Sequence, residues 1–206
     1  MLGASSSLVT VMSPFENYTK LAVAVTWVAW LLYWFISAFG NKAAARVDGW
    51  ASFLTYRVPL ILAFLLLFGR ALGRFWPWLG QRFLPHGMAW PCVGLAVLLL
   101  GLAFACWARV ALGRNWSATV QLKQGHELVT AGPYRWVRHP IYTGMLSGVL
   151  GSALVIGEWR GLIALVLVFA SFAYKLRHEE NWMREQFGAT YTEYMRHTKA
   201  LIPGLL

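Results

Sequence analysis

The sequence predicts an all-α, polytopic membrane protein with about five transmembrane helices, a C-terminal helical hairpin and polar segments on the cytoplasmic side. Three observations predict this fold. Of the 206 residues, 58% are hydrophobic and only 13% are charged, whereas a soluble domain is about 25% charged. Several runs approach the roughly 20 apolar residues that cross a bilayer. Lysine and arginine are distributed unevenly between the connections. This composition excludes a disordered or disulfide-based chain.

Five hydrophobic segments are expected to span the membrane. They cover residues 21–39, 51–69, 87–108, 140–157 and 161–174. The first and the fourth carry no charge. Arg57 interrupts the second, and the sequence leaves open whether residues 51–79 make a full crossing. The fifth is short, but Arg160 and Lys175 at its ends can extend their charged groups to the interface and complete it.

The last two spans are expected to form a tight antiparallel hairpin, because only a few residues around Gly157 separate them. Gly144, Gly148 and Gly151 recur along the fourth span. Small residues at this spacing let another helix approach closely in a membrane. The fourth span is therefore expected to pack against a neighbouring helix through these glycines.

Charge predicts the orientation. The net charge is +10, and 13 of the 18 lysines and arginines lie in the segments 41–57, 109–138 and 175–206. The positive-inside rule makes this side cytoplasmic. Arg70, Arg74 and Arg82 fall on the other side, which indicates an interfacial helix or an incomplete second span. Basic residues scattered beside lipid argue against nucleic-acid binding, and the lack of a targeting signal favours a prokaryotic inner membrane.

Ionisable and aromatic residues are concentrated in residues 121–142 and 175–194, which border the same membrane face. The hairpin is expected to bring Arg138 and His139 close to residues 175–180. Ionisable groups at membrane depth are costly unless they are paired or functional. We therefore divide the chain into N-terminal membrane helices, 1–110, and a catalytic region, 111–206. No metal-binding pattern is evident.

These two stretches carry motifs of a known family. Residues 132–144 read G-P-Y-R-W-V-R-H-P-I-Y-T-G, and this resembles the R-H-P-x-Y-x-G signature of isoprenylcysteine carboxyl methyltransferases and related phospholipid methyltransferases. Glu179-Glu180, Phe187-Gly188, Tyr191 and Tyr194, followed by Pro203, are similar to the E-E tail of that family. The resemblance covers about 90 residues, from roughly 117 to the end of the chain.

The resemblance implies an integral membrane methyltransferase that takes a methyl group from S-adenosyl-L-methionine and gives it to a lipophilic acceptor. Lys175 stands where eukaryotic members have an arginine implicated in the substrate carboxylate, which puts a prenylcysteine substrate in question. The expected catalytic residues are Lys175, Arg138 and Glu180. The expected cofactor-binding residues are Gln121, His126, Glu127, Leu128, Val129, Tyr134, His139, Pro140, Ile141, Tyr142 and Glu179.

Several alternatives stay open. A carboxylate acceptor needs no general base, whereas an amine needs one, for which Glu180 and His178 are candidates. An NADPH-dependent reductase of the sterol-reductase type has a related hairpin but tends to show R-H-x-N-Y, whereas here Pro140 follows His139 directly. A non-catalytic membrane or transport component would explain the spans but not the paired motifs. The acceptor and the oligomeric state are not determined by the sequence.

Overall fold

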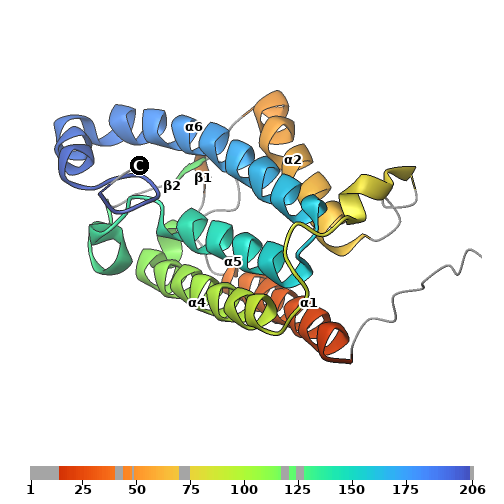
Figure 1. Cartoon of the computed structure of the whole chain (residues 1–206). Coiled ribbons are helices and arrows are strands. Elements are labelled where there is room, and N and C mark those ends of the chain that lie inside the picture. Colours follow the sequence, from red (N-terminus) through yellow and green to blue (C-terminus); the bar gives the residue numbers. More distant parts are fainter. Residues whose placement is uncertain are drawn as a thin grey trace, which may run out of the picture.

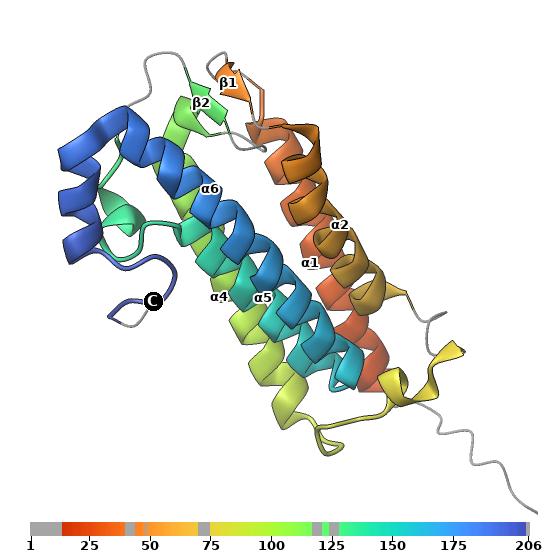
Figure 2. The ribbon, with the colours of Figure 1, turned by 90° about the horizontal axis from the view of Figure 1, so that it is seen from above.

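The computed structural model describes residues 14–39, 44–47, 49–69, 75–116, 121–123 and 128–204. Its fold is a bundle of five helices (Figures 1 and 2). Four of them are long and apolar enough to cross a membrane, and α5 is shorter but also apolar, which confirms the predicted architecture. The five helices are α1 (Pro14–Ser37), α2 (Trp50–Phe68), α4 (Ala89–Leu112), α5 (Pro140–Ile156) and α6 (Trp159–His197).

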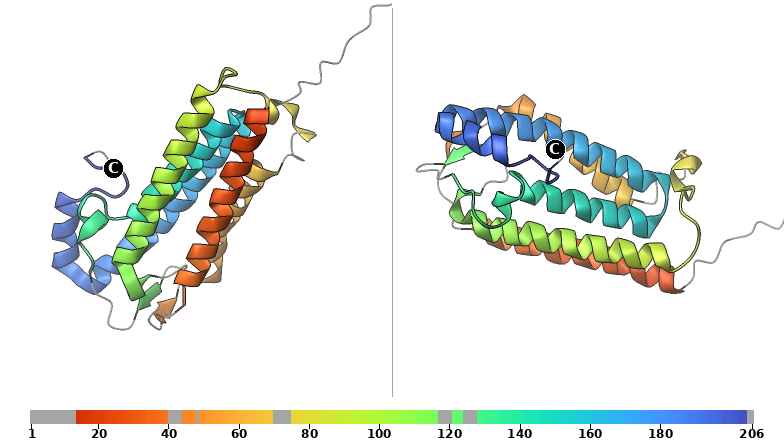
Figure 3. Two further views of the ribbon diagram at one scale, coloured as in Figure 1. Left: turned by 90° about the horizontal axis from the view of Figure 1, so that it is seen from below. Right: turned by 60° about the vertical axis from the view of Figure 1, so that its left-hand side comes forward.

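The helices form two layers with α5 between them, as the right-hand view of Figure 3 shows. In the described part of the chain, α2 packs against α6 on one side and α1 packs against α4 on the other. The segment 51–69, whose crossing the sequence left open, is the single helix α2 despite Arg57 and an internal proline, Pro59. A short antiparallel pair of strands, β1 (Ala44–Val47) and β2 (Gln121–Lys123), lies beyond the helices at one end.

The predicted C-terminal hairpin is present. Helix α5 ends at Ile156. Gly157, which follows it, has φ 66°, a conformation that glycine adopts readily, and α6 begins at Trp159. Residues 159–187 of α6, which precede Gly188, form a continuous helix about 44 Å long. Because the hydrocarbon core of a bilayer is about 30 Å thick, the C-terminal half of α6 extends beyond it. Gly188 has φ 51° and breaks α6 there, and the chain then folds back (Figure 1).

The three glycines of α5 pack against α4, apart from one contact with α1. A Cβ atom on Gly144 would lie 2.4 Å from the carbonyl oxygen of Gly101, and one on Gly151 would lie 2.4 Å from the backbone nitrogen of Leu98. A Cβ on Gly148 would lie 2.9 Å from the side chain of Leu102. The prediction that these glycines admit a neighbouring helix is therefore confirmed, and the partner is α4.

Charged residues tie the helices together at the end of the bundle opposite the strands. The Arg160 guanidinium is buried, contacts Glu158 at 2.6 Å, and donates to the carbonyl oxygens of Leu66 and Leu67 at the end of α2. Arg82 lies 3.6 Å from Glu16. Of the three arginines that the positive-inside rule placed on the unexpected side, Arg70 and Arg74 lie outside the described residues.

Candidate functional site

The site forms where the start of α5, the middle of α6 and the C-terminal tail meet. Backbone N–H groups of Arg138 and His139 donate to the carbonyl oxygens of Lys199 (2.8 Å) and Ala200 (3.0 Å). Pro140 occupies the first turn of α5, a position that needs no N–H donor. The tail therefore holds the two motif residues against the end of the hairpin.

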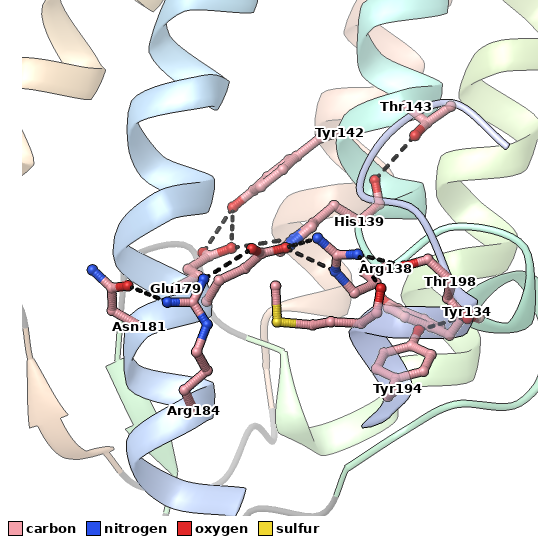
Figure 4. A network of polar contacts seen from close by, with 12 residues as sticks. Tyr134, Arg138, His139, Tyr142, Thr143, Glu179, Asn181, Arg184, Tyr194 and Thr198 are labelled. Carbon is pink, nitrogen blue, oxygen red and sulfur yellow. Dashed lines mark hydrogen bonds and ion pairs between the residues drawn. The ribbon is translucent and has the colours of Figure 1, made fainter. Parts of the chain in front are cut away.

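Arg138, which Figure 4 labels among the polar residues of this junction, forms a buried ion pair with Glu180. The Nε and Nη2 atoms of Arg138 lie 2.8 and 2.6 Å from the same oxygen of Glu180. The guanidinium also donates to the carbonyl oxygen of Thr198. Both side chains of the pair are less than 10% exposed. Arg138 thus connects α5, α6 and the tail through one group.

His139 and Tyr142 complete a polar cluster, which we define as Arg138, His139, Tyr142, Glu179 and Glu180. The imidazole lies 3.2 Å from Glu180 and 3.7 Å from Glu179. The Tyr142 hydroxyl donates to the Glu179 carboxylate, whose two oxygens lie 2.7 and 2.8 Å away. The His139 and Tyr142 rings are stacked 5.5 Å apart. The cluster therefore fixes both carboxylates against residues of the R-H-P-x-Y motif.

Lys175 lies beside this cluster, one helical turn before Glu179 on α6. Its ammonium is 3.7 Å from the Glu179 carboxylate, and the residue is buried. It also lies over two aromatic rings, 5.3 Å from the centre of Tyr56 and 5.4 Å from that of Tyr142. An ammonium between aromatic faces gains cation–π attraction, which offsets part of its burial.

Two tyrosines border the site from the loop before α5 and from the tail. The Tyr194 hydroxyl donates to the carbonyl oxygen of Tyr134. Burial, and after it the charge of Glu179, raises the pKa of the Tyr134 phenol well above its usual value. Tyr134 therefore stays protonated at neutral pH, and its hydroxyl can act as a hydrogen-bond donor.

A cavity of about 670 Å³ joins these groups to the interior of the bundle. One part is polar and is bordered by the cluster residues other than Glu180, by Lys175 and by the two tyrosines. The other part is apolar, and we call it the apolar chamber. The apolar chamber is lined by Trp30 of α1, Leu60 and Phe64 of α2, Met145 of α5 and Phe172 of α6.

Most of the predicted site residues that the structure describes lie in the wall of this cavity, but two do not. Pro140 and Glu180 lie behind the wall, and Glu180 reaches the site through Arg138. Gln121 begins β2, and its side chain lies outside the description. His126 and Glu127 lie outside the described residues. The predicted residues in the wall are Leu128, Val129, Tyr134, Arg138, His139, Ile141, Tyr142, Lys175 and Glu179.

Sequence reasoning missed the part of the wall that comes from the first half of the chain. Arg57 was the one residue there with a usable signal, because a charge inside an apolar span is a candidate for function. The aromatic residues carried no such signal, since tryptophan is common in membrane helices and at their ends. The missed wall residues include Trp30, Trp34, Tyr56, Arg57, Leu60, Phe64 and Trp116.

The fold and the site define a polytopic helical membrane protein in which a polar cluster opens into an apolar chamber. Residues 90–190 match the model of the phospholipid methyltransferase family, a range that contains the motif, the hairpin and the Glu179-Glu180 pair. The chain thus resembles the integral membrane methyltransferases of the isoprenylcysteine and phospholipid type, as the motifs predicted.

Curated relatives match about half of this chain. Protein-S-isoprenylcysteine O-methyltransferase B of Arabidopsis thaliana is 30% identical over 99 residues, which are 47% of this chain and 50% of the relative. The Saccharomyces cerevisiae protein-S-isoprenylcysteine O-methyltransferase is 33% identical over 94 residues (44% and 39%). The cobalt-zinc-cadmium resistance protein CzcN of Cupriavidus metallidurans is 33% identical over 96 residues (46% and 44%). The chain spans about half the length of these relatives, or less.

A solved structure shares the fold over almost the whole chain. It is that of the eukaryotic intramembrane Ras methyltransferase ICMT, an isoprenylcysteine carboxyl methyltransferase. The match covers 95% of this chain and 70% of that one, with a TM-score of 0.63 and 20% sequence identity. The match in fold therefore includes the helices of the N-terminal half, which carry no motif, as well as the motif region.

Proposed function

We propose that the chain is an integral membrane methyltransferase that transfers a methyl group from S-adenosyl-L-methionine to a lipophilic acceptor, in a bacterial-type inner membrane and with its site on the cytoplasmic side. The observation that carries this proposal is the Glu179 carboxylate. It is held by the Tyr142 hydroxyl at 2.7 and 2.8 Å in the wall of a cavity that is polar at one end and apolar at the other. Similarity to curated methyltransferases supports it.

The residues present fit this methyl donor. Its ammonium needs an acid, and Glu179 is the carboxylate in the described cavity wall. Its carboxylate needs a cation or N–H donor, which His139 can supply. Its adenine needs an aromatic slot, which Tyr134 and Tyr191 can provide. We assign the donor to the region 111–206, with the helices of residues 1–110 completing the wall.

When bound, the donor supplies an electrophilic methyl carbon to an oxygen or nitrogen of the acceptor, with cleavage of its carbon–sulfur bond. The protein then has mainly to position and desolvate the reacting groups. Tyr142 holds Glu179 in one orientation, and Arg138 with Glu180 fixes the loop that carries His139. We describe Glu180 as a positioning residue, because it does not line the cavity, and it holds in place Arg138, which does line it.

The nature of the acceptor decides whether a base is needed. A carboxylate acceptor has no proton to lose. An amine acceptor must lose one, and neither of the two predicted bases, Glu180 and His178, lines the cavity. His139 does line it, between the two glutamates. An amine acceptor would therefore transfer its proton to a neutral His139, and Arg138, which also lines the cavity, would then be the cation for the carboxylate of the donor.

S-adenosylhomocysteine should raise the thermal midpoint of the detergent-solubilised protein, because a ligand that binds only the folded state stabilises it. At a hundred times its Kd the ligand should contribute about 2.7 kcal/mol. Glu179→Gln and His139→Ala should each weaken binding by about 1–3 kcal/mol, the size of a lost charge-assisted hydrogen bond. Thermal unfolding followed at several ligand concentrations gives both quantities.

Glu193→Gln is the matched control, because Glu193 is an exposed carboxylate on the same helix that pairs with Arg196 and His197. It should respond to the ligand like the wild type. A midpoint that NADPH raises and S-adenosylhomocysteine does not would reject the methyltransferase and favour the reductase alternative.

Lys175→Ala should raise the acceptor KM or lower kcat while the affinity for S-adenosylhomocysteine stays nearly unchanged, the pattern of a lost acceptor contact. The reason is that its buried ammonium lines the cavity next to Glu179, where an anionic group of an amphiphilic acceptor could meet it. Lys175→Arg should keep most activity. Methyl transfer to a series of lipid acceptors measures the effect, with Lys199→Ala as an exposed control. Wild-type rates for Lys175→Ala at all acceptor concentrations would contradict the prediction.

A further inference from the structure

Along α2, Arg57 lies between Tyr56, whose ring the Lys175 ammonium contacts, and Leu60 of the apolar chamber. It belongs to α2, one of the helices long and apolar enough to cross a membrane, and it lines the cavity. Its guanidinium lies over the ring of Phe53, 5.2 Å from the ring centre, one turn earlier on the same helix. A cation within a membrane helix is costly and usually marks a functional position.

The depth of Arg57 is fixed by its neighbour Tyr56. The Ser171 hydroxyl donates to the Tyr56 carbonyl oxygen at 2.7 Å, which ties α2 to α6 at this level. Lys175, one turn after Ser171, places its ammonium over the Tyr56 ring. Arg57 and Lys175 therefore contribute two positive charges, from α2 and from α6, at the same level of one cavity.

The apolar chamber continues from this level into the bundle. Phe64 lies seven residues after Arg57 on α2, about 10 Å along the helix axis. Phe64 contacts Trp27 edge to face, 5.1 Å between ring centres, and the Trp27 indole is fixed by a 2.9 Å hydrogen bond to Ser152. Phe64 lines the chamber, so these contacts hold that part of its wall in place. An apolar chain can thus lie in the chamber with its head beside Arg57 and Lys175.

We propose that Arg57 and Lys175 together bind the anionic head group of the methyl acceptor, which is then an amphiphile whose apolar chain occupies the chamber of Trp30, Leu60, Phe64, Met145 and Phe172. This inference rests on the proposed methyl transfer for the identity of the ligand as acceptor. The planar guanidinium suits the two oxygens of a carboxylate or phosphate, and the ammonium adds a point charge. The head group lies next to Glu179 and His139, where the donor is assigned.

The test compares three C14 amphiphiles that differ only in the head group: tetradecanoate, tetradecyl phosphate and tetradecanol. Their affinities for the protein in neutral detergent are measured by titration calorimetry. Arg57→Gln should weaken binding of the better anionic ligand about tenfold or more, the scale of a lost hydrogen bond to a charged group. The affinity for tetradecanol should change less than about twofold, since that ligand uses the chamber alone.

Two further variants control for the fold and for charge. Arg57→Lys keeps the charge and should lose less affinity than Arg57→Gln. Arg196→Gln removes an exposed arginine of the same cytoplasmic end, with 72% of its side chain accessible, and should bind all three ligands like the wild type. Retained affinity for S-adenosylhomocysteine in Arg57→Gln shows that the variant is folded.

Each outcome has a distinct meaning. Tighter binding of tetradecanoate assigns the site to a lipid carboxylate, and tighter binding of tetradecyl phosphate assigns it to a lipid phosphate. Unchanged affinity of Arg57→Gln for both anionic ligands, or an equal loss for tetradecanol, overturns the head-group site. Selective loss of anionic ligands in a protein that binds no S-adenosylhomocysteine would support the head-group site and reject the methyltransferase.

Discussion

Replacing Arg138 with alanine is expected to lower the free energy of unfolding by about 3 kcal/mol, the lower end of the range for breaking a buried ion pair. The loss lies at this end because Glu180 would keep longer contacts with His139 at 3.2 Å and Arg184 at 3.7 Å. Glu180 would lose its contacts at 2.6 and 2.8 Å while staying buried. The Thr198 carbonyl oxygen would lose a donor, so the tail would also loosen. Unfolding in mixed micelles of maltoside and dodecyl sulfate, followed by tryptophan fluorescence, measures the loss.

The double variant Arg138→Met with Glu180→Leu separates positioning from chemistry. It removes both charges, and well-packed apolar replacements of a buried pair are often neutral in stability. We expect it to regain most of the stability that Arg138→Ala loses and to bind S-adenosylhomocysteine. Recovered stability without recovered binding would mean that the pair contacts the donor directly. An Arg138→Ala protein as stable as the wild type would contradict the ion-pair argument.

The hairpin and its polar cluster could be predicted from local sequence. Only a few residues separate the last two spans, so Arg138 and His139 had to lie near residues 175–180, and the structure joins them at 2.6–3.7 Å. The membrane helices could be predicted because most of their apolar runs are uncharged and approach the length that crosses a bilayer. The helix that packs against the glycines of α5 could not be predicted. The sequence shows that a neighbouring helix can approach closely there, but it does not show which helix does so.

The wall contributed by α1 and α2 could not be predicted. These helices meet the cavity through tertiary packing, and nothing in their local pattern distinguishes Trp30 or Phe64 from an aromatic residue that faces lipid. In the sequence, Arg57 is a charged residue that interrupts an apolar span, whereas in the structure it lines the cavity. Residues from both proposed segments, 1–110 and 111–206, line the cavity. The division of the chain into these segments therefore separates the part with motifs from the part without, but it does not separate the wall of the cavity from the rest.

Gly144→Ala is expected to be the second substitution with a large effect, costing about 3 kcal/mol or more of stability, the upper part of the range for overpacking. The added methyl carbon would lie 2.4 Å from the Gly101 carbonyl oxygen and 2.7 Å from the Ala105 backbone nitrogen. Both atoms belong to the backbone of α4, so no side-chain rotation relieves the clash, and α5 must move away from α4.

That movement should also reach the site, because Gly144 follows Tyr142 by two residues and His139 by five. We therefore expect Gly144→Ala to bind S-adenosylhomocysteine more weakly, even at temperatures where it is folded. The control is Gly80→Ala, since a Cβ atom at Gly80 meets nothing within 4 Å. Its unfolding midpoint and ligand affinity should match the wild type. If Gly144→Ala unfolds at the wild-type midpoint, then α4 and α5 do not approach as closely as the motif glycine implies, and the R-H-P-x-Y-x-G signature needs its glycine for another reason.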